Sequence, residues 1–228
     1  MTFGPLSTTT YTANSVSFGM VRIPPGRFMD DKGVYRRNLL VSRPFEIGIT
    51  LVTQTLWRAV TDSSPSHFKG EDRPVEEVSY DDVQAFLARL PALGLTGFRL
   101  PTEAEWAWAA RCGAPTRWSG ADRVKSVAVA AGSRTKPVAG LRSGPVGVFD
   151  QSGNLWEWVA DWSQGLVALG AGPAGGIDPA GLPSGIARIN RGASWSDNPF
   201  HTSITSRITV GSESVDADLG FRLLRSAD

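Results

Sequence analysis

The stretch RGASWSDNPFHTSITSRITVGSESVDADLGFR, residues 191–222, is the part of the chain from which its fold can be inferred. It opens on a Gly-Ala-Ser-Trp turn and closes on Leu-Gly-Phe-Arg. The residues between these ends are mostly short, polar or β-branched, and they follow neither the period of a helix nor the alternation of a strand. Two well-defined ends therefore enclose a segment without a regular pattern.

The composition is that of a globular chain. Apolar residues make up 41% and charged residues 20% of its 228 residues, so folding can bury a sizeable core. With 25 glycines, 15 prolines and 8 tryptophans, a loop-rich architecture is favoured over a helix bundle or a doubly wound sheet. No linker is visible, and we expect one domain over residues 1–228, with residues 1–18 as a loosely held N-terminal arm.

Charge and cysteine content exclude several classes of function. The net charge of +1 gives no broad attraction to phosphate backbones or anionic membranes, so nucleic acid is not an expected partner. The single cysteine, Cys112, excludes a disulfide within the chain. Neither a secretory signal nor a run of about 18 apolar residues is present, so we expect a soluble chain without membrane insertion, in a compartment that the sequence does not indicate.

Three helices are predicted from their capping residues. Ser79 with Asp82 forms a capping-box pattern ahead of an apolar stripe at helical spacing, which predicts a helix over residues 80–90. Thr102 with Glu105 repeats this pattern and predicts a second helix. A shorter helix is expected over residues 53–60, with Thr53 as its N-cap.

Strands are predicted where apolar runs lie between turn signals. We expect an edge strand over residues 11–18, two strands around the Pro-Pro-Gly turn within residues 20–28, one strand over residues 43–49, and a strand, a turn and a second strand within residues 146–159. Residues 112–147 and 163–186 are rich in glycine and proline and are predicted to be long surface loops.

Four motifs in order carry a family resemblance. They are FRLPTEAEW (98–106) with AAR (109–111), GNLWEW (153–158) with Asp161 and Trp162, RGASW (191–195), and GFR (220–222). Together they resemble the formylglycine-generating-enzyme-like (sulfatase-modifying factor) domains over residues 20–225. The resemblance implies an α+β, C-type-lectin-like fold with small twisted antiparallel sheets, two main helices and long loops. It does not define the function, because this scaffold carries oxidases, iron enzymes and binding proteins.

Residues that the enzymes of this family need are missing from the sequence. The resemblance implies that oxidising members bind copper through a pair of C-terminal cysteines, one of them close to the Gly-Phe-Arg motif, and residues 220–225 contain none. Iron-dependent relatives need a cluster of histidines, whereas His67 and His201 are the only two in this chain. We therefore expect no copper, no iron and no catalytic residues.

The chain most resembles the variable proteins of diversity-generating retroelements. In those proteins a C-terminal segment, typically from a Gly-Ser-Trp turn to a Gly-Phe-Arg, is rewritten at template adenines and forms a ligand-binding surface. Residues 191–222 match this frame, which implies a non-catalytic ligand-binding protein with its variable region there. The alternatives are a metal- or oxygen-dependent enzyme of the formylglycine-generating family and a constant structural or accessory domain of that family.

The predicted ligand-binding positions lie between the two ends of the segment. They are Ser196, Asp197, Asn198, Phe200, His201, Ile204, Ser206, Ile208, Thr209, Val210, Gly211, Ser214, Asp216, Ala217 and Asp218. Exposed Phe200, Ile204, Ile208 and Val210 would form an apolar patch, which is typical of interaction sites. A protein ligand is favoured over a small molecule, because short mixed side chains on a scaffold resemble a paratope. The alternative is an ordinary polar loop between two strands.

The codons of a diversified segment would restrict its composition. Randomising the adenines of AAC codons gives NNC codons, which cannot encode Trp, Met, Lys, Gln or Glu. Between Ser196 and Asp218 only Glu213 lies outside the permitted set, so Glu213 would be an invariant position.

A structural calcium site is predicted around the Gly153-Asn154 turn. Asp150 and Glu157 bracket this turn, and their carboxylates, with the carbonyls of Gly153 and Leu155, could complete a shell of hard oxygen ligands. The resemblance implies calcium at the matching positions. The alternative is that Glu157 caps buried backbone donors without a metal.

The remaining motif residues are assigned to the core. We expect this of Trp106, Trp108, Trp156, Trp158, Trp162 and Trp195, and we expect Arg99, Arg111, Arg191 and Arg222 to pair with Glu103, Glu105 and Asp161. Cys112 is expected to be a small, partly buried thiol.

Overall fold

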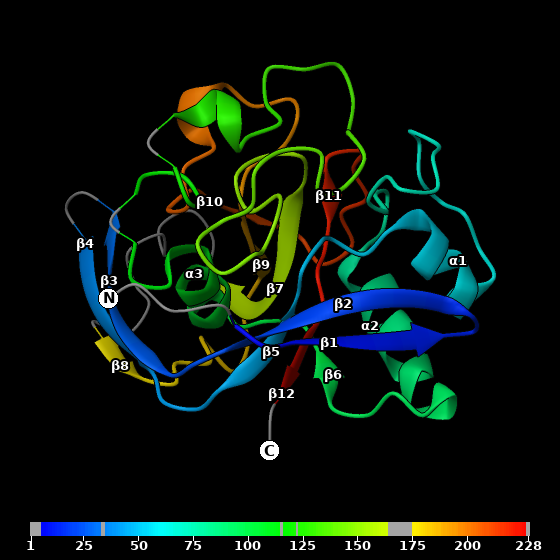
Figure 1. Ribbon diagram of the computed structural model, residues 1–228, viewed down its shortest axis with the longest axis horizontal. Helices are drawn as coiled ribbons and strands as arrows, with labels where there is room; N and C mark the ends of the chain where they lie inside the picture. The colour runs from blue at the N-terminus through cyan, green and yellow to red at the C-terminus, as the bar shows by residue number, and fades with distance from the viewer. Residues whose placement is uncertain (1–5, 33–34, 115, 122, 164–174, 227–228) are drawn as a thin grey trace.

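The computed structural model describes residues 6–32, 35–114, 116–121, 123–163 and 175–226. Within these residues the chain forms three small sheets, three α-helices and short 3-10 turns (Figure 1). The strands are β1 (Thr8–Ala13), β2 (Val16–Ile23), β3 (Gly26–Lys32), β4 (Tyr35–Val41), β5 (Phe45–Gly48), β6 (Phe98–Arg99), β7 (Trp156–Ser163), β8 (Gly175–Ile177), β9 (Ala187–Arg191), β10 (Arg207–Val210), β11 (Leu219–Gly220) and β12 (Leu224–Ser226). The helices are α1 (Gln54–Thr61), α2 (Tyr80–Arg89) and α3 (Glu103–Arg111), with 3-10 turns η1 (Leu90–Leu93), η2 (Val124–Ser126) and η4 (Pro199–His201).

The sheets confirm the α+β class that the motifs imply. Their strand orders are β1-β2-β5-β12-β6, β10-β9-β7-β11 and β3-β4-β8. Most pairings are antiparallel, as expected, but β11 runs parallel to β7 and β8 runs parallel to β4. The parallel pairs join segments that are far apart in the sequence, so no local sequence pattern predicts them.

The three helices begin where their caps predict. The hydroxyl of Thr53 accepts a hydrogen bond from the Leu56 amide at the start of α1. Both predicted capping boxes are present, at Ser79 with Asp82 and at Thr102 with Glu105. Each box satisfies amides that the first helical turn leaves without partners, which explains why these boundaries follow from the sequence.

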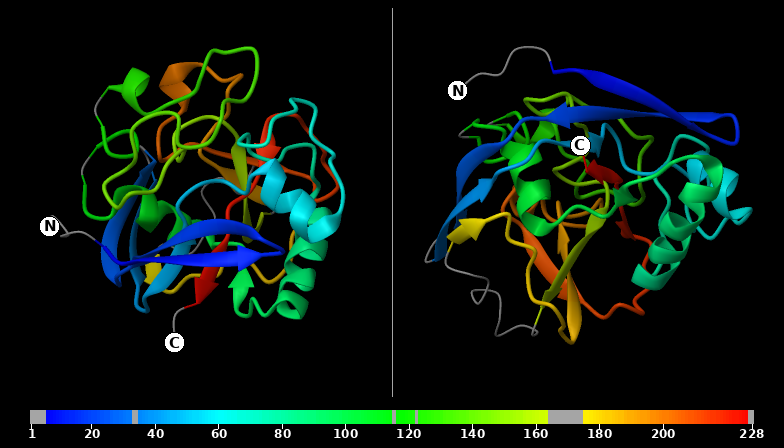
Figure 2. Two further views of the ribbon diagram at one scale, coloured as in Figure 1. Left: turned by 45° about the vertical axis from the view of Figure 1, so that its right-hand side comes forward. Right: turned by 90° about the horizontal axis from the view of Figure 1, so that it is seen from below.

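Strand β7 divides the core into two parts. Trp156 and Trp158 pack with α1 and α2, whereas Val159 packs with α3. Because successive side chains of a strand point to opposite faces, Glu157 and Asp161 face α3 with Val159. The right-hand view of Figure 2, seen from below, shows α3 on one side of β7 and the α1–α2 pair on the other.

The N-terminal arm differs from its prediction. Residues 11–18 are not one edge strand; they contain the turn of a β1–β2 hairpin, at Asn14 and Ser15, whose φ angles are 43° and 74°. Two left-handed residues suit a tight hairpin, and asparagine tolerates this conformation well. The hydroxyl of Tyr11 donates to Glu46 on β5 at 2.6 Å, so the arm is held from β1 onward. Residues 1–5 lie outside the described residues.

Two further predictions need correction. Residues 146–155 form no strand, because Asp150 and Asn154 adopt left-handed φ angles of 60° and 70°, and the single strand β7 starts at Trp156. The predicted loop over residues 163–186 contains the short strand β8. Its residues 164–174 lie outside the described part of the chain.

Candidate functional site

The segment between β9 and β11 forms one end of the molecule. The chain leaves β9 through two left-handed residues, Gly192 (φ 98°) and Ala193 (φ 63°), which turn it sharply. It then passes through η4, beside η2, and returns along β10 to β11 (Figure 1). The segment therefore has a defined path, although its sequence shows no regular pattern.

Backbone hydrogen bonds fix the first half of this path. The Trp195 amide donates to the carbonyl of Asn154 at 2.9 Å, and the Trp195 carbonyl accepts from Gly132 at 2.8 Å. The Asp197 carbonyl accepts from Ala131 at 2.8 Å. In each case the segment contributes a main-chain atom, so these bonds do not depend on which side chain stands at that position.

The second half is held in the same way. The carbonyls of Ser212, Asp216 and Asp218 accept from the amides of Tyr80, Glu77 and Trp156, at 2.9, 3.1 and 2.8 Å. The donors belong to α2, the residues before it and β7, all outside the segment. The main chain of the segment is thus fixed from both sides by the rest of the fold.

The buried guanidinium of Arg191 connects the segment to α3. Arg191 is fully buried, donates to the carbonyl of Ile204 at 2.8 Å and pairs with Glu103 on α3 at 3.2 Å. Arg207 on β10 pairs with the same carboxylate at 2.9 Å. The predicted pairing of Arg191 with Glu103 is confirmed, and it links the segment to α3.

The predicted binding positions differ in exposure. Exposed side chains are those of Ser196, Asn198, Phe200, His201 and Asp216, and partly buried positions are Asp197, Ser206, Ile208, Thr209, Val210, Gly211, Ser214, Ala217 and Asp218. The predicted apolar patch is therefore wrong in part, because Ile204 is 1% exposed and belongs to the core beneath α3. Ile208 and Val210 pack against the α1–α2 core, and Phe200 is 66% exposed.

Some side chains of the segment stabilise its own turns. Asp197 accepts from the Ser194 amide at 2.8 Å, and Asn198 accepts from the Phe200 amide at 3.0 Å. Asp218 accepts from the hydroxyls of Ser194 and Ser196, each at 3.1 Å, and burial raises its pKa. These three residues have structural roles that the sequence did not indicate, although Asp and Asn are typical of such turns.

The residues predicted to bind calcium serve other partners. Both carboxylate oxygens of Glu157 contact Arg222, at 2.5 and 2.8 Å, and one also accepts from the Trp106 indole at 2.8 Å. Asp150 accepts from the Ala139 amide at 2.9 Å, and burial raises the pKa of Asp150 to about 6.

This donor set does not fit a calcium ion. A cation at Glu157 would lie next to the guanidinium of Arg222, which already neutralises the carboxylate. The geometry agrees with the alternative in which Glu157 serves buried donors without a metal, and the calcium site, with Gly153 and Leu155 as further ligands, stays a prediction without support from these contacts.

A carboxyl group buried beneath the segment couples stability to pH. Asp161 accepts from the Glu103 amide at 2.7 Å; burial, and then the charge of Glu103, raise the pKa of Asp161 to about 7. The folded state therefore holds this proton more tightly than the unfolded state. The resulting stabilisation is fully present below about pH 4 and is lost as the pH rises through about 7.

The substitution Asp161→Asn tests this coupling. Asparagine keeps an acceptor for the Glu103 amide but cannot ionise, so we expect a smaller fall in the free energy of unfolding between about pH 4 and pH 8. Urea unfolding at a series of pH values measures this. Asp72→Asn, on an exposed side chain, is the control and should keep the wild-type profile. Identical profiles for Asp161→Asn and the wild type would contradict the coupling.

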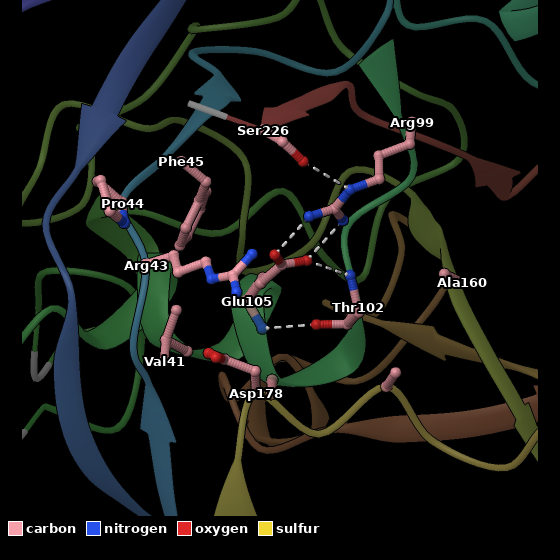
Figure 3. A pocket seen from close by; sticks show the side chains of 12 residues that line it. Val41, Arg43, Pro44, Phe45, Arg99, Thr102, Glu105, Ala160, Asp178 and Ser226 are labelled. Carbon is pink, nitrogen blue, oxygen red and sulfur yellow. Dashed lines mark hydrogen bonds and ion pairs between the residues drawn. The ribbon is translucent and has the colours of Figure 1, made fainter. Parts of the chain in front are cut away.

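A pocket of about 920 Å³ lies away from the segment, between Val41–Phe45, the start of α3 and Asp178. Several of its polar groups are engaged with one another (Figure 3): Arg99 pairs with Glu105 at 2.6 Å and donates to Ser226 at 3.2 Å, while the Thr102 amide donates to Glu105. The residues that line it include neither histidine nor cysteine, and both of its carboxylates already accept hydrogen bonds, Glu105 from Arg99 and Asp178 from Ser42.

The described residues contain no group of three or more His, Cys, Asp or Glu side chains arranged to hold a metal ion. Cys112 is buried rather than partly exposed, and burial raises the pKa of its thiol to about 12, which disfavours the reactive thiolate. In the same described part of the chain, no helix is long and apolar enough to cross a bilayer.

A family model and a solved structure are similar to this chain over nearly its whole length. A model of the sulfatase-modifying factor enzyme 1-like domain matches residues 8–227. Among solved structures, variable protein 1 of Treponema denticola superposes with a TM-score of 0.87 and 29% sequence identity, covering 96% of this chain and 99% of that one.

Curated relatives carry different names. The chaperone protein LppX of Paenibacillus barcinonensis is 27% identical over 268 residues, which cover 93% of this chain and 91% of that protein. The formylglycine-generating enzyme of Thermomonospora curvata is 30% identical over 190 residues, or 73% of this chain. The matched region spans 60% of that enzyme's length.

Proposed function

Because the chain belongs to the sulfatase-modifying factor enzyme 1-like domain family, we propose that it is a non-catalytic member of that family, which uses residues 191–222 as a diversified ligand-binding surface. The similarity to variable protein 1 of Treponema denticola, over nearly the whole of both chains, supports this assignment. The single cysteine and the two histidines also favour binding over the oxidative chemistry of the family's enzymes.

The observation that carries the proposal is how the segment is held. The constant part of the fold binds its main chain at Trp195, Asp197, Ser212, Asp216 and Asp218 through backbone atoms. Exposed side chains other than those that hold its turns can therefore change while the path of the chain stays the same. A surface built in this way can accept new ligands without refolding, because exposed substitutions usually alter stability by less than about 0.5 kcal/mol.

A protein is the proposed ligand class. The exposed positions carry short polar side chains around one exposed aromatic ring, Phe200, on an open surface rather than in a pocket. Such surfaces resemble the paratopes of antibodies, which use a few rings as anchors and polar side chains as adaptable contacts. The name of LppX, a chaperone protein, also describes binding rather than catalysis.

The flanking DNA tests the origin of the segment. We expect a reverse transcriptase gene close to the coding sequence, and an imperfect repeat of its 3′ end that differs at adenines. Complete sequencing of the locus checks both features. A locus with neither would refute the proposed diversification.

A displayed library tests the binding surface. We expect most variants randomised at Ser196, Phe200, His201 and Asp216 to stay folded, because these side chains are exposed. Protease resistance on the cell surface measures folding, and sorting on a defined protein such as lysozyme measures binding. The matched control randomises Thr202 and Ile204, which are 0% and 1% exposed, and should lose most folded members. Equal losses in the two libraries, or no lysozyme binders in the first, would contradict the proposal.

The enzyme alternative has its own assay. Copper analysis of the purified chain and turnover of a Cys-x-Pro-x-Arg peptide would detect formylglycine-generating activity. We expect neither copper retention nor product, since Cys112 is the only cysteine and is buried. Both together would establish the alternative.

A further inference from the structure

One loop of the chain concentrates positive charge. Residues 116–142 contain six cationic residues, Arg117, Arg123, Lys125, Arg134, Lys136 and Arg142, and one acidic residue, Asp122. Their net charge of +5 contrasts with the +1 of the whole chain, so the remainder of the molecule is negative. We call residues 116–142 the cationic loop. An excess of positive charge in one loop of a near-neutral protein can attract an acidic partner to that loop.

The cationic loop borders the proposed binding surface. The Ile204 amide donates to the carbonyl of Arg117 at 3.1 Å, and Arg117 donates to the carbonyl of Phe200 at 3.1 Å. Further along, Ala131 and Gly132 donate to the carbonyls of Asp197 and Trp195. Figures 1 and 2 show η2, within the cationic loop, next to η4 of the segment.

Three of the cations gather around η2. Arg123 and Lys125 lie at its start and within it, and the Arg142 amide donates to the carbonyl of Ser126 at 3.1 Å. All three side chains are exposed, and in the described part of the chain they make no hydrogen bond or ion pair. These exposed charges lie near Phe200 and His201 on the neighbouring η4, where a ligand that touches η4 would meet them.

We propose that the cationic loop is a constant part of the binding face and that it directs the protein towards ligands with an acidic protein surface. This inference rests on the proposed function. The variable side chains would supply the specific contacts, while Arg123, Lys125 and Arg142 would supply a fixed attraction shared by all variants. Charges at the rim of an interface mainly raise the association rate and suppress partners of the wrong charge.

A protein partner fits the face better than a nucleic acid does. The segment also carries the exposed carboxylate of Asp216 and the partly exposed carboxylates of Asp197 and Asp218, and the charges of Asp216 and Asp197 act on Asp218. Such groups would repel a continuous line of phosphates. An acidic protein surface presents separated carboxylates among neutral groups, and arginine binds carboxylates with two parallel hydrogen bonds.

The experiment compares two charge-reversal variants of the full chain. Arg123→Glu, Lys125→Glu and Arg142→Glu are combined in one variant. The matched control combines Arg22→Glu, Arg27→Glu and Arg43→Glu, which changes the net charge equally at exposed positions on β2, on β3 and before β5. Both variants should keep the wild-type unfolding midpoint, because all six side chains are exposed.

The probe is a phage-displayed library of random peptides, whose selected sequences reveal the preferred charge. We expect the wild type and the control to enrich peptides rich in Asp and Glu. The variant that combines Arg123→Glu, Lys125→Glu and Arg142→Glu, called the η2 variant, should lose this preference. Its association rate with the same peptides should be lower by about 10-fold. Raising the salt concentration should remove most of the difference between wild type and variant. An unchanged peptide pool for the η2 variant would overturn the inference.

Two additional arms separate the possible failures. In Phe200→Ala with His201→Ala, peptide binding should fall while the preference for acidic sequences remains. If the preference for acidic peptides remained and binding did not depend on Phe200 and His201, the proposed function would be wrong. If binding depended on Phe200 and His201 without a preference for acidic peptides, only the role of the cationic loop would be wrong. Tight binding of duplex DNA or of poly(U) RNA that the η2 substitutions abolish would identify a nucleic-acid site and overturn the acidic-protein assignment.

Discussion

Replacing Arg222 with methionine is expected to lower the free energy of unfolding by about 3–5 kcal/mol, because it leaves a buried carboxylate without its cationic partner. Arg222 and Glu157 are both fully buried, and the guanidinium also donates to the carbonyls of Gly48 and Phe149, at 3.0 and 2.9 Å. Without Arg222, Glu157 keeps the Trp106 indole as its remaining donor among these groups. Urea unfolding, followed by fluorescence, measures the loss.

An exposed ion pair provides the matched control. Arg58 pairs with Glu71 at 3.4 Å, and their side chains are 49% and 78% exposed. We expect Arg58→Met to cost between 0 and about 1 kcal/mol, since water screens such pairs. The double variant Arg222→Met with Glu157→Met should lose less than the sum of its two single variants, because each single variant leaves one unpaired buried charge and the double variant leaves none. Equal losses for Arg222→Met and Arg58→Met would refute the structural role of the buried pair.

Substituting Ile204 with alanine is expected to cost about 2–5 kcal/mol, although the residue lies in the middle of the proposed variable surface. Ile204 is 1% exposed, packs in the core beneath α3, and its carbonyl accepts from the buried Arg191. The substitution removes apolar contacts and leaves a cavity that the surrounding core can fill only in part. Unfolding in urea gives the size of the effect.

Phe200 is the control within the same segment. It is a larger apolar residue, but its side chain is 66% exposed, so Phe200→Ala should change the free energy of unfolding by less than about 0.5 kcal/mol. The pair tests whether burial rather than residue type decides which positions can vary. If Ile204→Ala were as mild as Phe200→Ala, the core position of Ile204 would be wrong.

The starts of the helices could be predicted from short sequence patterns. Ser79 and Thr102 announce α2 and α3, because a capping box satisfies amides of the same helical turn and needs no distant partner. The hairpin turn at Asn14 and Ser15 was missed, since the expected edge strand ran through both residues. Their left-handed φ angles come with the pairing of β1 and β2.

The ends of the candidate site could be predicted from the sequence, but the burial of the side chains between them could not. Trp195 and Phe221 mark its ends as motif residues. Phe221 lies in the core, whereas Trp195, which was expected there, is only partly buried. Ile204 and Phe200 are both apolar residues in an irregular segment, so periodicity cannot tell which one points inward. The partner of Glu157 was likewise hidden, because Arg222 lies 65 residues away in the sequence.

By itself the sequence determined the starts of the three helices and the presence of one cysteine and two histidines, and its motifs implied the α+β class through a family resemblance. The helix starts and the residue counts depend only on residue type and on neighbours within one helical turn. Only the tertiary structure decided which side chains of residues 191–222 face outward, that Arg222 pairs with Glu157, and that the cationic loop lies beside Phe200. Each of these depends on contacts between distant segments, whose geometry is set when β7, β9 and α3 pack together and not by any local pattern.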